Sequence, residues 1–267
     1  IHQCCSCGLV QHALAPVSYY RDVIRAVAFS PEMAEFRKGQ LADWLDRAGL
    51  RDKSVLEIGS GRGEYLELLM QAGAARVAGI EGSSASVAQA RARGLDVAQG
   101  YLEEGLGNPW PHRFHGFAIF SFMEHWPDLK GSLARLHELL QPDARGLVEV
   151  PNFEFVLAKG LYSEFTPDHI FYFDRSTLRR VLELCGFEVQ AIRAVWHDYI
   201  LSAEVVRRQR MDTRRFDEVQ RKVVHDIHAF VAPFDPREVV VWGAGHQALA
   251  VLSLANLGGR VSHVVDS

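Results

Sequence analysis

The chain has little of what marks membrane, secreted or nucleic-acid-binding proteins. No apolar run approaches the roughly 18 residues that a membrane-spanning helix needs, and no signal-peptide pattern opens the sequence. The formal net charge of −4 provides no basic surplus for nucleic acid or an anionic membrane. Cysteine is also scarce: the chain has four, three of them close to its start, which does not suggest a disulfide framework. We therefore expect a cytoplasmic protein without nucleic-acid or membrane partners; its oligomeric state does not follow from the sequence.

The composition is that of a globular protein. A hydrophobic content of 48% and a charged content of 23% are ordinary for such chains. A length of 267 residues suffices for one large or two modest domains. Ile1 is not a natural first residue, and Ser267 comes just after a predicted strand, so we expect a piece of a longer polypeptide.

A glycine-rich turn organises the rest of the chain. The β-rich run Val55–Ile58 leads through Gly59, Gly61 and Gly63 into residues 64–69, whose leucines recur at helical spacing. A strand, a tight loop and a helix in this order form the opening unit of a nucleotide-binding α/β sheet. The glycines allow positive φ angles and close approach to the backbone, and the first N–H groups of the helix face a ligand in the loop.

The acids around this turn indicate which ligand it holds. A dinucleotide fingerprint would place glycine or alanine at position 64, but Glu64 stands there and would repel a pyrophosphate. The order acid-x-Gly-x-Gly-x-Gly instead resembles that of class I S-adenosylmethionine methyltransferases, whose ligand carries no phosphate. The next predicted strand ends in Glu81, where a carboxylate can accept hydrogen bonds from both ribose hydroxyls. The alternative is a generic strand–turn–helix with an exposed acid. The residues expected to bind S-adenosylmethionine here are Glu57, Gly59, Ser60, Gly61, Gly63, Glu81 and Gly82.

Strands and helices alternate along the middle of the chain. The sequence predicts strands over 54–59, 76–81, 95–99, 116–122 and 145–151, with helices within 16–50 and near 63–72, 84–93 and 129–140. Strands over 187–195 and 198–207 then form an antiparallel hairpin. This alternation predicts an α/β fold, a doubly wound and mostly parallel seven-stranded sheet with helices on both faces. The ligand should lie at the carboxyl ends of the strands.

Two stretches that follow strands are candidate walls of the cofactor pocket. Tyr101 comes after the third strand and could stack on an adenine ring or merely pack. Ser121 and Phe122 come after the fourth strand, beside the expected methyl donor. Residues 123–125 (Met-Glu-His) resemble the Leu-Glu-His signature of many class I methyltransferases at this position. We expect this Glu–His pair to be structural rather than catalytic.

The segment 162–173 combines aromatic and titratable side chains. It contains Asp168, His169 and Tyr172, and Asp174 directly after it is expected to cap a helix. A connector of this composition is typical of an active-site wall. The alternative is an aromatic flap over the sheet, with His169 held by local hydrogen bonds.

The N-terminal cysteines match half of a zinc knuckle. Cys4 and Cys7 form a C-x-x-C that is followed by glycine, which permits the tight turn around the metal. Tetrahedral zinc needs four ligands, and no second C-x-x-C follows. We expect residues 1–15 to be a partial zinc-binding segment, with the other ligands upstream or supplied by His2 and His12. The alternative is a set of reduced thiols without a metal.

The last part of the chain predicts a second nucleotide-type turn. Residues 208–236 have a charged boundary followed by helical spacing, as in a linker helix whose basic cluster is a solvated face. Residues 237–267 then begin a Rossmann-like domain that is not completed. Its turn, Gly243–Gly245, fits G-x-G-x-x-A, and Asp266 ends the next strand, which by itself predicts a dinucleotide site.

The order of these parts is similar to that of the sugar C-methyltransferase family of deoxysugar biosynthesis. The resemblance rests on Cys-x-x-Cys-Gly-Leu-Val-Gln at 4–11, the methyltransferase core over 16–207, Asp-His-x-x-Tyr-Phe at 168–173 and Trp-Gly-Ala-Gly at 242–245. It implies a zinc-binding N-terminal part, a central S-adenosylmethionine domain and a C-terminal domain that helps to hold a nucleotide sugar.

The resemblance also implies catalytic residues. In that family a Glu–His pair ahead of Tyr–Phe is linked to proton abstraction beside a sugar ketone. The matching residues here are Asp168, which stands in the place of the family's Glu, and His169, with Tyr172 shortly after. The resemblance therefore implies His169 as the general base and Asp168 as the residue that orients it.

Three functions remain open at this point. The first is methyl transfer from S-adenosylmethionine to carbon or oxygen of a nucleotide-linked sugar or a related small metabolite. The second is an NAD-dependent oxidoreductase that uses the Gly243–Gly245 turn. The third is a non-catalytic module that retains S-adenosylmethionine as a structural ligand.

Overall fold

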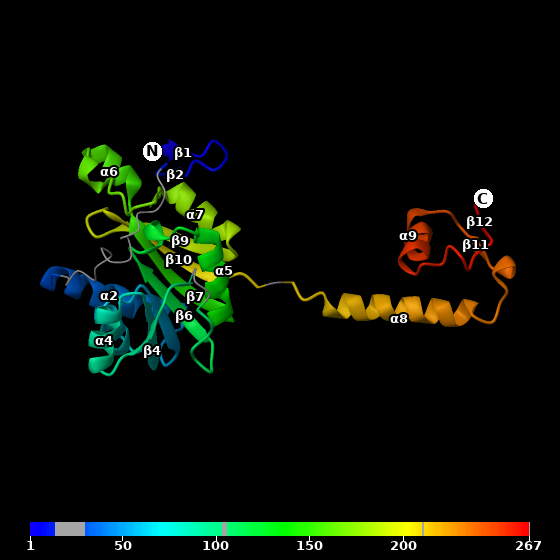
Figure 1. The fold of residues 1–267 in the computed structure, drawn as a ribbon, viewed down its shortest axis with the longest axis horizontal. Helices are drawn as coiled ribbons and strands as arrows, with labels where there is room; N and C mark the ends of the chain where they lie inside the picture. The colour runs from blue at the N-terminus through cyan, green and yellow to red at the C-terminus, as the bar shows by residue number, and fades with distance from the viewer. Residues whose placement is uncertain (14–29, 103–105, 210, 267) are drawn as a thin grey trace. The chain divides into compact units, whose positions relative to one another are not determined.

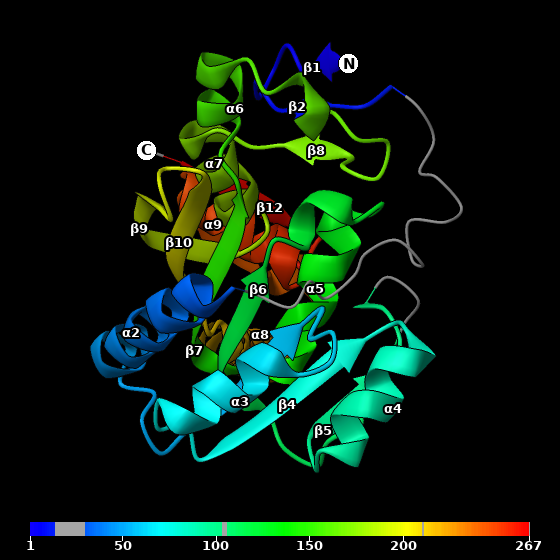
Figure 2. The ribbon, with the colours of Figure 1, turned by 90° about the vertical axis from the view of Figure 1, so that its left-hand side faces the viewer.

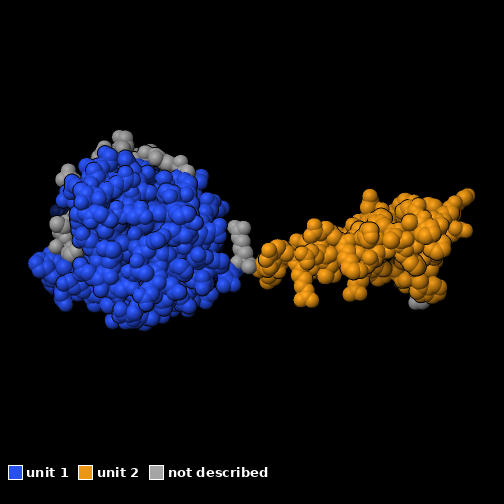
Figure 3. All heavy atoms as spheres, turned by 90° about the horizontal axis from the view of Figure 1, so that it is seen from below, with its two compact units in different colours: residues 1–209 blue, residues 210–267 orange. Residues whose placement is uncertain are grey.

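The computed structural model describes residues 1–13, 30–102, 106–209 and 211–266. The predicted helical region 16–50 therefore lies partly outside the described residues. The chain divides into two compact units, residues 1–209 and residues 210–267, which Figure 3 shows in different colours. Each unit is described by itself.

The first unit is built on one mixed sheet (Figure 1). Its seven strands lie in the order β5-β4-β3-β6-β7-β10-β9. All of them run in one direction except β10, which is antiparallel to both of its neighbours. The strands are β3 (Ser54–Ile58), β4 (Arg76–Glu81), β5 (Asp96–Gln99), β6 (Phe114–Phe120), β7 (Leu140–Pro151), β9 (Phe187–Val195) and β10 (Ile200–Arg207). The predicted mostly parallel, seven-stranded sheet is confirmed.

Alternate residues of the strands face two separate layers of helices, as the two-residue period of a strand requires. On one face Val55 and Val77 pack with leucines of α2 and α3 and with Val87 and Ala90 of α4. On the other face Leu56 and Ile80 pack in the cluster that holds the leucines of α5 and α7. The helices are α2 (Pro31–Ala48), α3 (Glu64–Gln71), α4 (Ser84–Ala92), α5 (Leu129–Leu139) and α7 (Arg175–Leu184). All five are labelled in Figure 2. The sheet is therefore doubly wound.

Polar caps fix the ends of the helices that were expected from sequence. Gly49 closes α2 in the left-handed conformation. The Asp174 carboxylate accepts a hydrogen bond from the Thr177 backbone N–H, and Thr177 Oγ1 accepts one from the Asp174 N–H, which completes a capping box. The predicted cap at Asp174 is confirmed.

Some element boundaries differ from the prediction. Strand β6 ends at Phe120 rather than at residue 122, because Ser121 has a φ of 46° and leaves the extended conformation. Strand β7 starts at Leu140 rather than at Arg145, so that Leu140, the last residue of the predicted helix, belongs to the strand. These shifts place Ser121 in the turn beyond the sheet edge.

The connector after β7 contains more structure than the sequence indicated. Helix α6 (Phe153–Lys159) and the short 3₁₀ turn η3 (Tyr162–Glu164) precede β8 (Phe171–Tyr172). The N-terminal segment forms a hairpin of β1 (His2–Gln3) and β2 (Val10–Gln11), and β2 pairs antiparallel with β8. The cysteine-containing segment is thus part of the first unit and lies against the predicted active-site connector.

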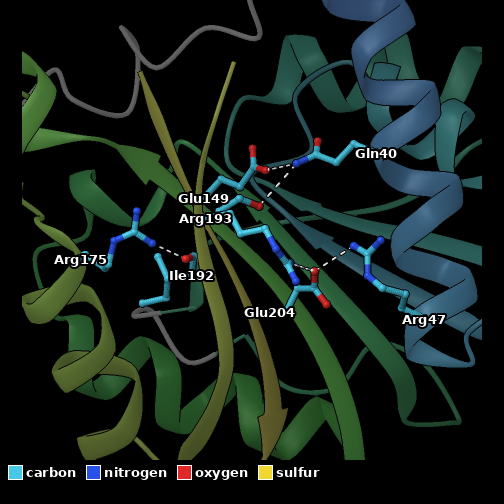
Figure 4. A network of polar contacts seen from close by, with 8 residues as sticks. Gln40, Arg47, Glu149, Arg175, Ile192, Arg193 and Glu204 are labelled. Atoms are coloured by element: carbon cyan, nitrogen blue, oxygen red, sulfur yellow. Dashed lines mark hydrogen bonds and ion pairs between the residues drawn. The ribbon is translucent and has the colours of Figure 1, made fainter. Parts of the chain in front are cut away.

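A buried ion pair joins α2 to β7. The Arg37 guanidinium contacts the Glu149 carboxylate, and both side chains are almost fully buried. Gln40 also donates to Glu149, and a second pair further along the helix, Arg47 with Glu204, lies nearer the surface (Figure 4). These contacts fix the helix across the central strands.

The second unit is a small α/β arrangement. Helix α8 (Arg214–Val231) and η4 (Pro236–Glu238) lead to β11 (Val240–Trp242), α9 (His246–Leu254) and β12 (His263–Val265), and the two strands are parallel. Its core is a small cluster around Val231 and Leu257. None of the helices described in either unit is long and apolar enough to cross a membrane.

Candidate cofactor and acceptor site

The glycine turn after β3 has the backbone conformation that the sequence predicted. Gly59, Gly61 and Gly63 have φ angles of 77°, 54° and 90°, a region that residues with a Cβ rarely adopt. Gly63 is the N-cap of α3, so the first N–H groups of that helix point toward the loop. Ser60 lies between Gly59 and Gly61. Its Oγ is buried against β4 and has no hydrogen-bond partner among the described residues. The turn therefore offers backbone, not the Ser60 hydroxyl, to a ligand.

Two acids flank this turn from neighbouring strands. Glu81 ends β4, and its two carboxylate oxygens accept hydrogen bonds of 2.8 Å from the backbone N–H groups of Gly61 and Ser83. Each oxygen keeps a second lone pair, which a ribose hydroxyl could donate to. Glu57 in β3 is buried, and its pKa lies well above the ordinary value. The main cause is burial, and the negative charges of Glu64 and Glu81 raise the pKa further. One acid is thus available to a ligand, whereas the other lies beneath the turn.

Aromatic rings cover two of the glycines. The Phe122 ring lies over Gly59, and the Tyr101 ring lies over Gly82, so that a Cβ at either glycine would overlap a ring. Ser121 is exposed in the turn between β6 and these rings. The structure therefore gathers the predicted pocket residues at the carboxyl ends of β3, β4 and β6, as the doubly wound topology requires.

A second cluster of titratable groups lies just past β6. Glu124 and His125 belong to the 3₁₀ turn η2 (Met123–His125), and the Ile170 N–H donates to the Glu124 backbone oxygen, which joins η2 to the 165–173 segment. The His125 and His169 rings are 4.7 Å apart between centroids. The donor atoms of Glu124, His125 and His169 all lie within 4.8 Å of one another, close enough for one small ligand or one ion to touch all three.

Burial governs the charge of this cluster. Glu124 is fully buried, and desolvation raises its pKa to about 8. Desolvation also lowers the pKa of His125 to about 4 and lowers the pKa of His169. At neutral pH the three side chains are therefore uncharged, so that an acid with a proton to donate stands beside two imidazoles that can accept one.

The three residues expected to act in catalysis occupy different places. His169 faces His125, whereas the Asp168 carboxylate lies 3.7 Å from Nδ1 of His125 and its backbone oxygen is 2.9 Å from the same nitrogen. The Tyr172 hydroxyl is 2.9 Å from Nε2 of His12 in the N-terminal hairpin. The described contacts therefore join Asp168 to His125 and Tyr172 to the N-terminal hairpin. Of the three predicted catalytic residues, His169 is the one that belongs to the cluster with Glu124 and His125.

Two polar residues of this region were not recognised as site residues in the sequence. Arg37 lies beneath the site on α2, with its guanidinium 4.8 Å from the Phe120 ring centroid and its Nε without a partner. A signal was present, since Arg37 precedes Leu41 by four residues on the apolar face of the helix. Glu124 was assigned a structural role because a Glu–His pair carries no signal of how deeply the Glu is buried.

The structure does not assemble the metal site that the cysteine segment predicted. Backbone N–H groups of Cys7 and Ser6 donate to the Cys4 sulfur and lower the pKa of its thiol. Among the described residues, the groups of three or more converging ligands do not include Cys4 or Cys7. His12, which was expected as a possible ligand, is hydrogen-bonded to Tyr172. Zinc binding by this segment therefore stays a prediction.

The Gly243 turn of the second unit forms the predicted strand–turn–helix. Gly243 has a φ of 102°, and its N–H donates to the Val265 oxygen on the parallel strand β12. Gly245 is the N-cap of α9. The side chains of β11 are largely open, with Trp242 80% exposed.

The fold and the glycine turn define the first unit as a class I S-adenosylmethionine-dependent methyltransferase. The seven-stranded sheet with one antiparallel strand, the acid-and-glycine turn after the first strand of the parallel set, and the second acid at the next strand end occur together. The chain belongs to the family described as methyltransferase domain, whose model matches residues 33–192. The Gly243 turn lies outside the matched residues.

Known proteins are similar over the same region. A C-methyltransferase, NovU of Streptomyces niveus, is 31% identical over 150 residues, which cover 54% of this chain and 35% of NovU. An enzyme named ubiquinone biosynthesis O-methyltransferase, of Pseudomonas paraeruginosa, is 33% identical over 116 residues, which cover 41% of this chain and 50% of that enzyme. The chain thus spans between a third and a half of the length of these relatives.

Solved structures share the fold at low identity. The plantazolicin methyltransferase BpumL in complex with SAH superposes with a TM-score of 0.54 at 13% identity, over 67% of this chain and 86% of that one. The magnesium protoporphyrin IX methyltransferase ChlM of Synechocystis with bound SAH superposes with a TM-score of 0.52 at 16% identity, over 70% of this chain and 92% of that one. The likeness concerns the fold. The family membership supports a methyltransferase over an oxidoreductase or a non-catalytic module.

Proposed function

We propose that the chain transfers the methyl group of S-adenosylmethionine to a nucleotide-linked sugar or a related biosynthetic intermediate, with His169 as the general base. The observation that carries the proposal is the position of His169. It lies at the same edge of the sheet as the glycine turn, in contact with η2, which directly follows the turn of Ser121 and Phe122. The similarity to a protein named C-methyltransferase NovU supports a carbon acceptor, and the similarity to an O-methyltransferase keeps oxygen as the alternative.

The cofactor residues have distinct roles in this proposal. The Gly59–Gly63 backbone receives the methionine part and the Glu81 carboxylate receives the ribose hydroxyls. Glu57 supports the turn from below, Phe122 and Ser121 bound the methyl donor, and Tyr101 covers the place of the adenine. S-adenosylmethionine supplies an activated methyl group on a sulfonium, so that the chain has mainly to align the acceptor with it.

The acceptor side has to remove a proton. His169 is uncharged at neutral pH because burial lowers its pKa, and an uncharged imidazole can take a proton from the acceptor. Asp168 fixes the neighbouring His125 through the contact with Nδ1, and Tyr172 ties the segment to the N-terminal hairpin. A zinc ion bound through Cys4 and Cys7 would stabilise that hairpin, with two further ligands from outside the described residues. We expect the reaction in the cytoplasm.

Product analysis tests the proposed function. The full chain is incubated with methyl-labelled S-adenosylmethionine and a panel of nucleotide sugars, ketone-bearing ones included, and the products are analysed by mass spectrometry. We expect label in one acceptor class, and fragmentation then distinguishes a C-methyl from an O-methyl product. Label in none of the sugars, but in a quinol or phenol added to the panel, would contradict the sugar acceptor.

A further inference from the structure

Glu124 is an unusual residue because one oxygen of its buried carboxyl group has no partner among the described residues. The side chain is fully buried, and although the Glu124 backbone N–H donates to the carboxyl group, Oε2 forms no hydrogen bond with any described residue. None of the ion pairs among the described residues involves the carboxyl group. A buried polar atom without a partner is costly, and a buried carboxylate without a cation is far more so. A packing role alone does not account for a polar atom left in this state.

In the described part of the structure, the groups around Glu124 include two bases and no cation. Its neighbours are His125 on its own turn, Asp168 and His169 on the 165–173 segment, and Tyr199 in the turn before β10, whose hydroxyl donates to Glu164. The Asp168 charge disfavours ionisation of Glu124 further. The charged groups in this set are the carboxylates of Asp168 and Glu164, which disfavour a further negative charge. The Glu124 carboxyl group therefore keeps its proton at neutral pH.

The location of Glu124 relates it to the methyl acceptor. It belongs to η2, only two residues after Phe122, whose ring lies over Gly59 of the cofactor turn. The ring nitrogens of His125 and His169 lie within 4.8 Å of its carboxyl oxygen. A molecule that brings a C–H or O–H group to His169 therefore has its next oxygen within reach of Glu124.

We propose that Glu124 is a second catalytic residue, a neutral carboxylic acid that donates a hydrogen bond to an oxygen of the acceptor while His169 takes the proton. The inference rests on the proposed function and adds a preference to it: an acceptor whose reacting carbon adjoins a carbonyl group. A neutral acid beside a neutral base is the arrangement that stabilises the negative charge of an enolate.

The proposed step balances in atoms and electrons. The C–H bond beside the carbonyl breaks, its proton goes to His169, and its electron pair moves toward the carbonyl oxygen. Glu124 stabilises this oxygen through its O–H without a net transfer. The carbon then forms a bond to the methyl group, the carbon–sulfur bond breaks, and its electron pair returns to sulfur. His169 later releases the proton to solvent.

The protonation of Glu124 is tested without any acceptor. Infrared difference spectra between the wild-type full chain and Glu124→Gln isolate the signal of this carboxyl group. We expect the carbonyl band of a protonated acid at pH 7, decreasing as the pH rises through about 8. Glu154→Gln, which changes an exposed glutamate, is the control and should not remove the band. A carboxylate signal at pH 7 would overturn the proposal.

Metal analysis of the same proteins separates an acid from a metal ligand. We expect no stoichiometric divalent ion that is lost in Glu124→Gln. A bound ion that depends on Glu124, His125 and His169 would show that the carboxyl group is an ionised ligand and would overturn the proposal. Because neither measurement needs an acceptor, each decides even if the sugar panel fails.

Turnover provides the second readout once the panel identifies an acceptor. Glu124→Gln keeps a hydrogen-bond donor, so we expect its kcat within about tenfold of the wild type, whereas Glu124→Ala should lose about 10²- to 10³-fold, as removal of one donor to a developing oxyanion does. Both variants should bind S-adenosylmethionine normally, which also shows that they fold. Wild-type turnover of Glu124→Ala on a carbonyl acceptor would contradict the inference.

Discussion

At the scale of single residues, we propose that Glu81 connects the cofactor turn to its ligand. Its carboxylate accepts two backbone hydrogen bonds and has lone pairs left for the ribose. Glu81→Ala removes hydrogen bonds to a charged acceptor, each worth about 1.5–3 kcal/mol. We expect the Kd for S-adenosylmethionine to rise about 10- to 100-fold, measured by equilibrium dialysis. Glu138→Ala, an exposed glutamate of α5, should leave Kd unchanged, and an unchanged Kd in Glu81→Ala would exclude the ribose contact.

His169 carries the prediction for catalysis. His169→Ala should keep the affinity for S-adenosylmethionine and lower turnover by about 10²-fold or more, the range for loss of a general base. Since burial lowers its pKa, the active uncharged form persists below the ordinary histidine value of about 6.5. The acid limb of the wild-type pH–rate profile should therefore lie below that pH and be absent from the residual activity of the variant. Unchanged turnover would remove His169 from the mechanism.

Sequence reasoning located backbone features better than buried charges. The positive φ of Gly59, Gly61 and Gly63 followed from their pattern, since only glycine adopts such angles readily. The isolation of Glu124 did not, because burial depends on which segments fold over η2, and Ile170 belongs to a segment 46 positions later. Nor did the hydrogen bond between Tyr172 and His12, which joins residues 160 positions apart in the sequence.

At the scale of elements, the pair of Arg37 and Glu149 holds α2 to the sheet. Arg37→Met leaves Glu149 buried without a counter-charge, which destabilises proteins by about 3–5 kcal/mol. We expect a loss of that size in the free energy of unfolding, measured by urea denaturation. The matched control is Arg47→Met, because Arg47 is about half exposed in its pair with Glu204 (Figure 4) and should cost only about 0–1 kcal/mol. Equal losses of unfolding free energy in the two variants would contradict the claim that the buried pair contributes more to stability than the exposed pair.

Helices and strands with a clear period were predictable, whereas short pairings were not. Strand β4 and the antiparallel strands β9 and β10 were predictable from runs of apolar or alternating residues. Helix α6 was missed because its seven residues offer less than two turns of apolar period. Strands of two residues, such as β2 and β8, have no period of their own and exist only because they pair.

At the scale of the whole molecule, the two units have separate hydrophobic cores. The predicted cofactor residues all belong to residues 1–209. A chain shortened to residues 1–209 should therefore bind S-adenosylmethionine within about threefold of the full chain, as measured by calorimetry. A loss of binding in a shortened chain that keeps the far-ultraviolet spectrum of a folded α/β protein would show that the second unit contributes to the cofactor site.

The order of parts along the chain was predictable in outline because α/β units follow from local signals. Alternating strands and helices between residues 54 and 151 predicted the parallel part of the sheet. The place of the cysteine segment was not predictable, since a C-x-x-C pattern states which ligands it offers and not which strand it pairs with. Its pairing with β8 brings the N-terminal hairpin against the 165–173 segment.

The central claim is that the glycine turn and strand ends at the carboxyl ends of β3, β4 and β6 bind S-adenosylmethionine. Titration calorimetry of the full chain, with S-adenosylmethionine and with NAD in separate runs, tests it most directly. The account predicts saturable binding of one S-adenosylmethionine per chain, weakened about 10- to 100-fold in Glu81→Ala, and no saturable binding of NAD at this site. Saturable binding of NAD together with no heat from S-adenosylmethionine would contradict it.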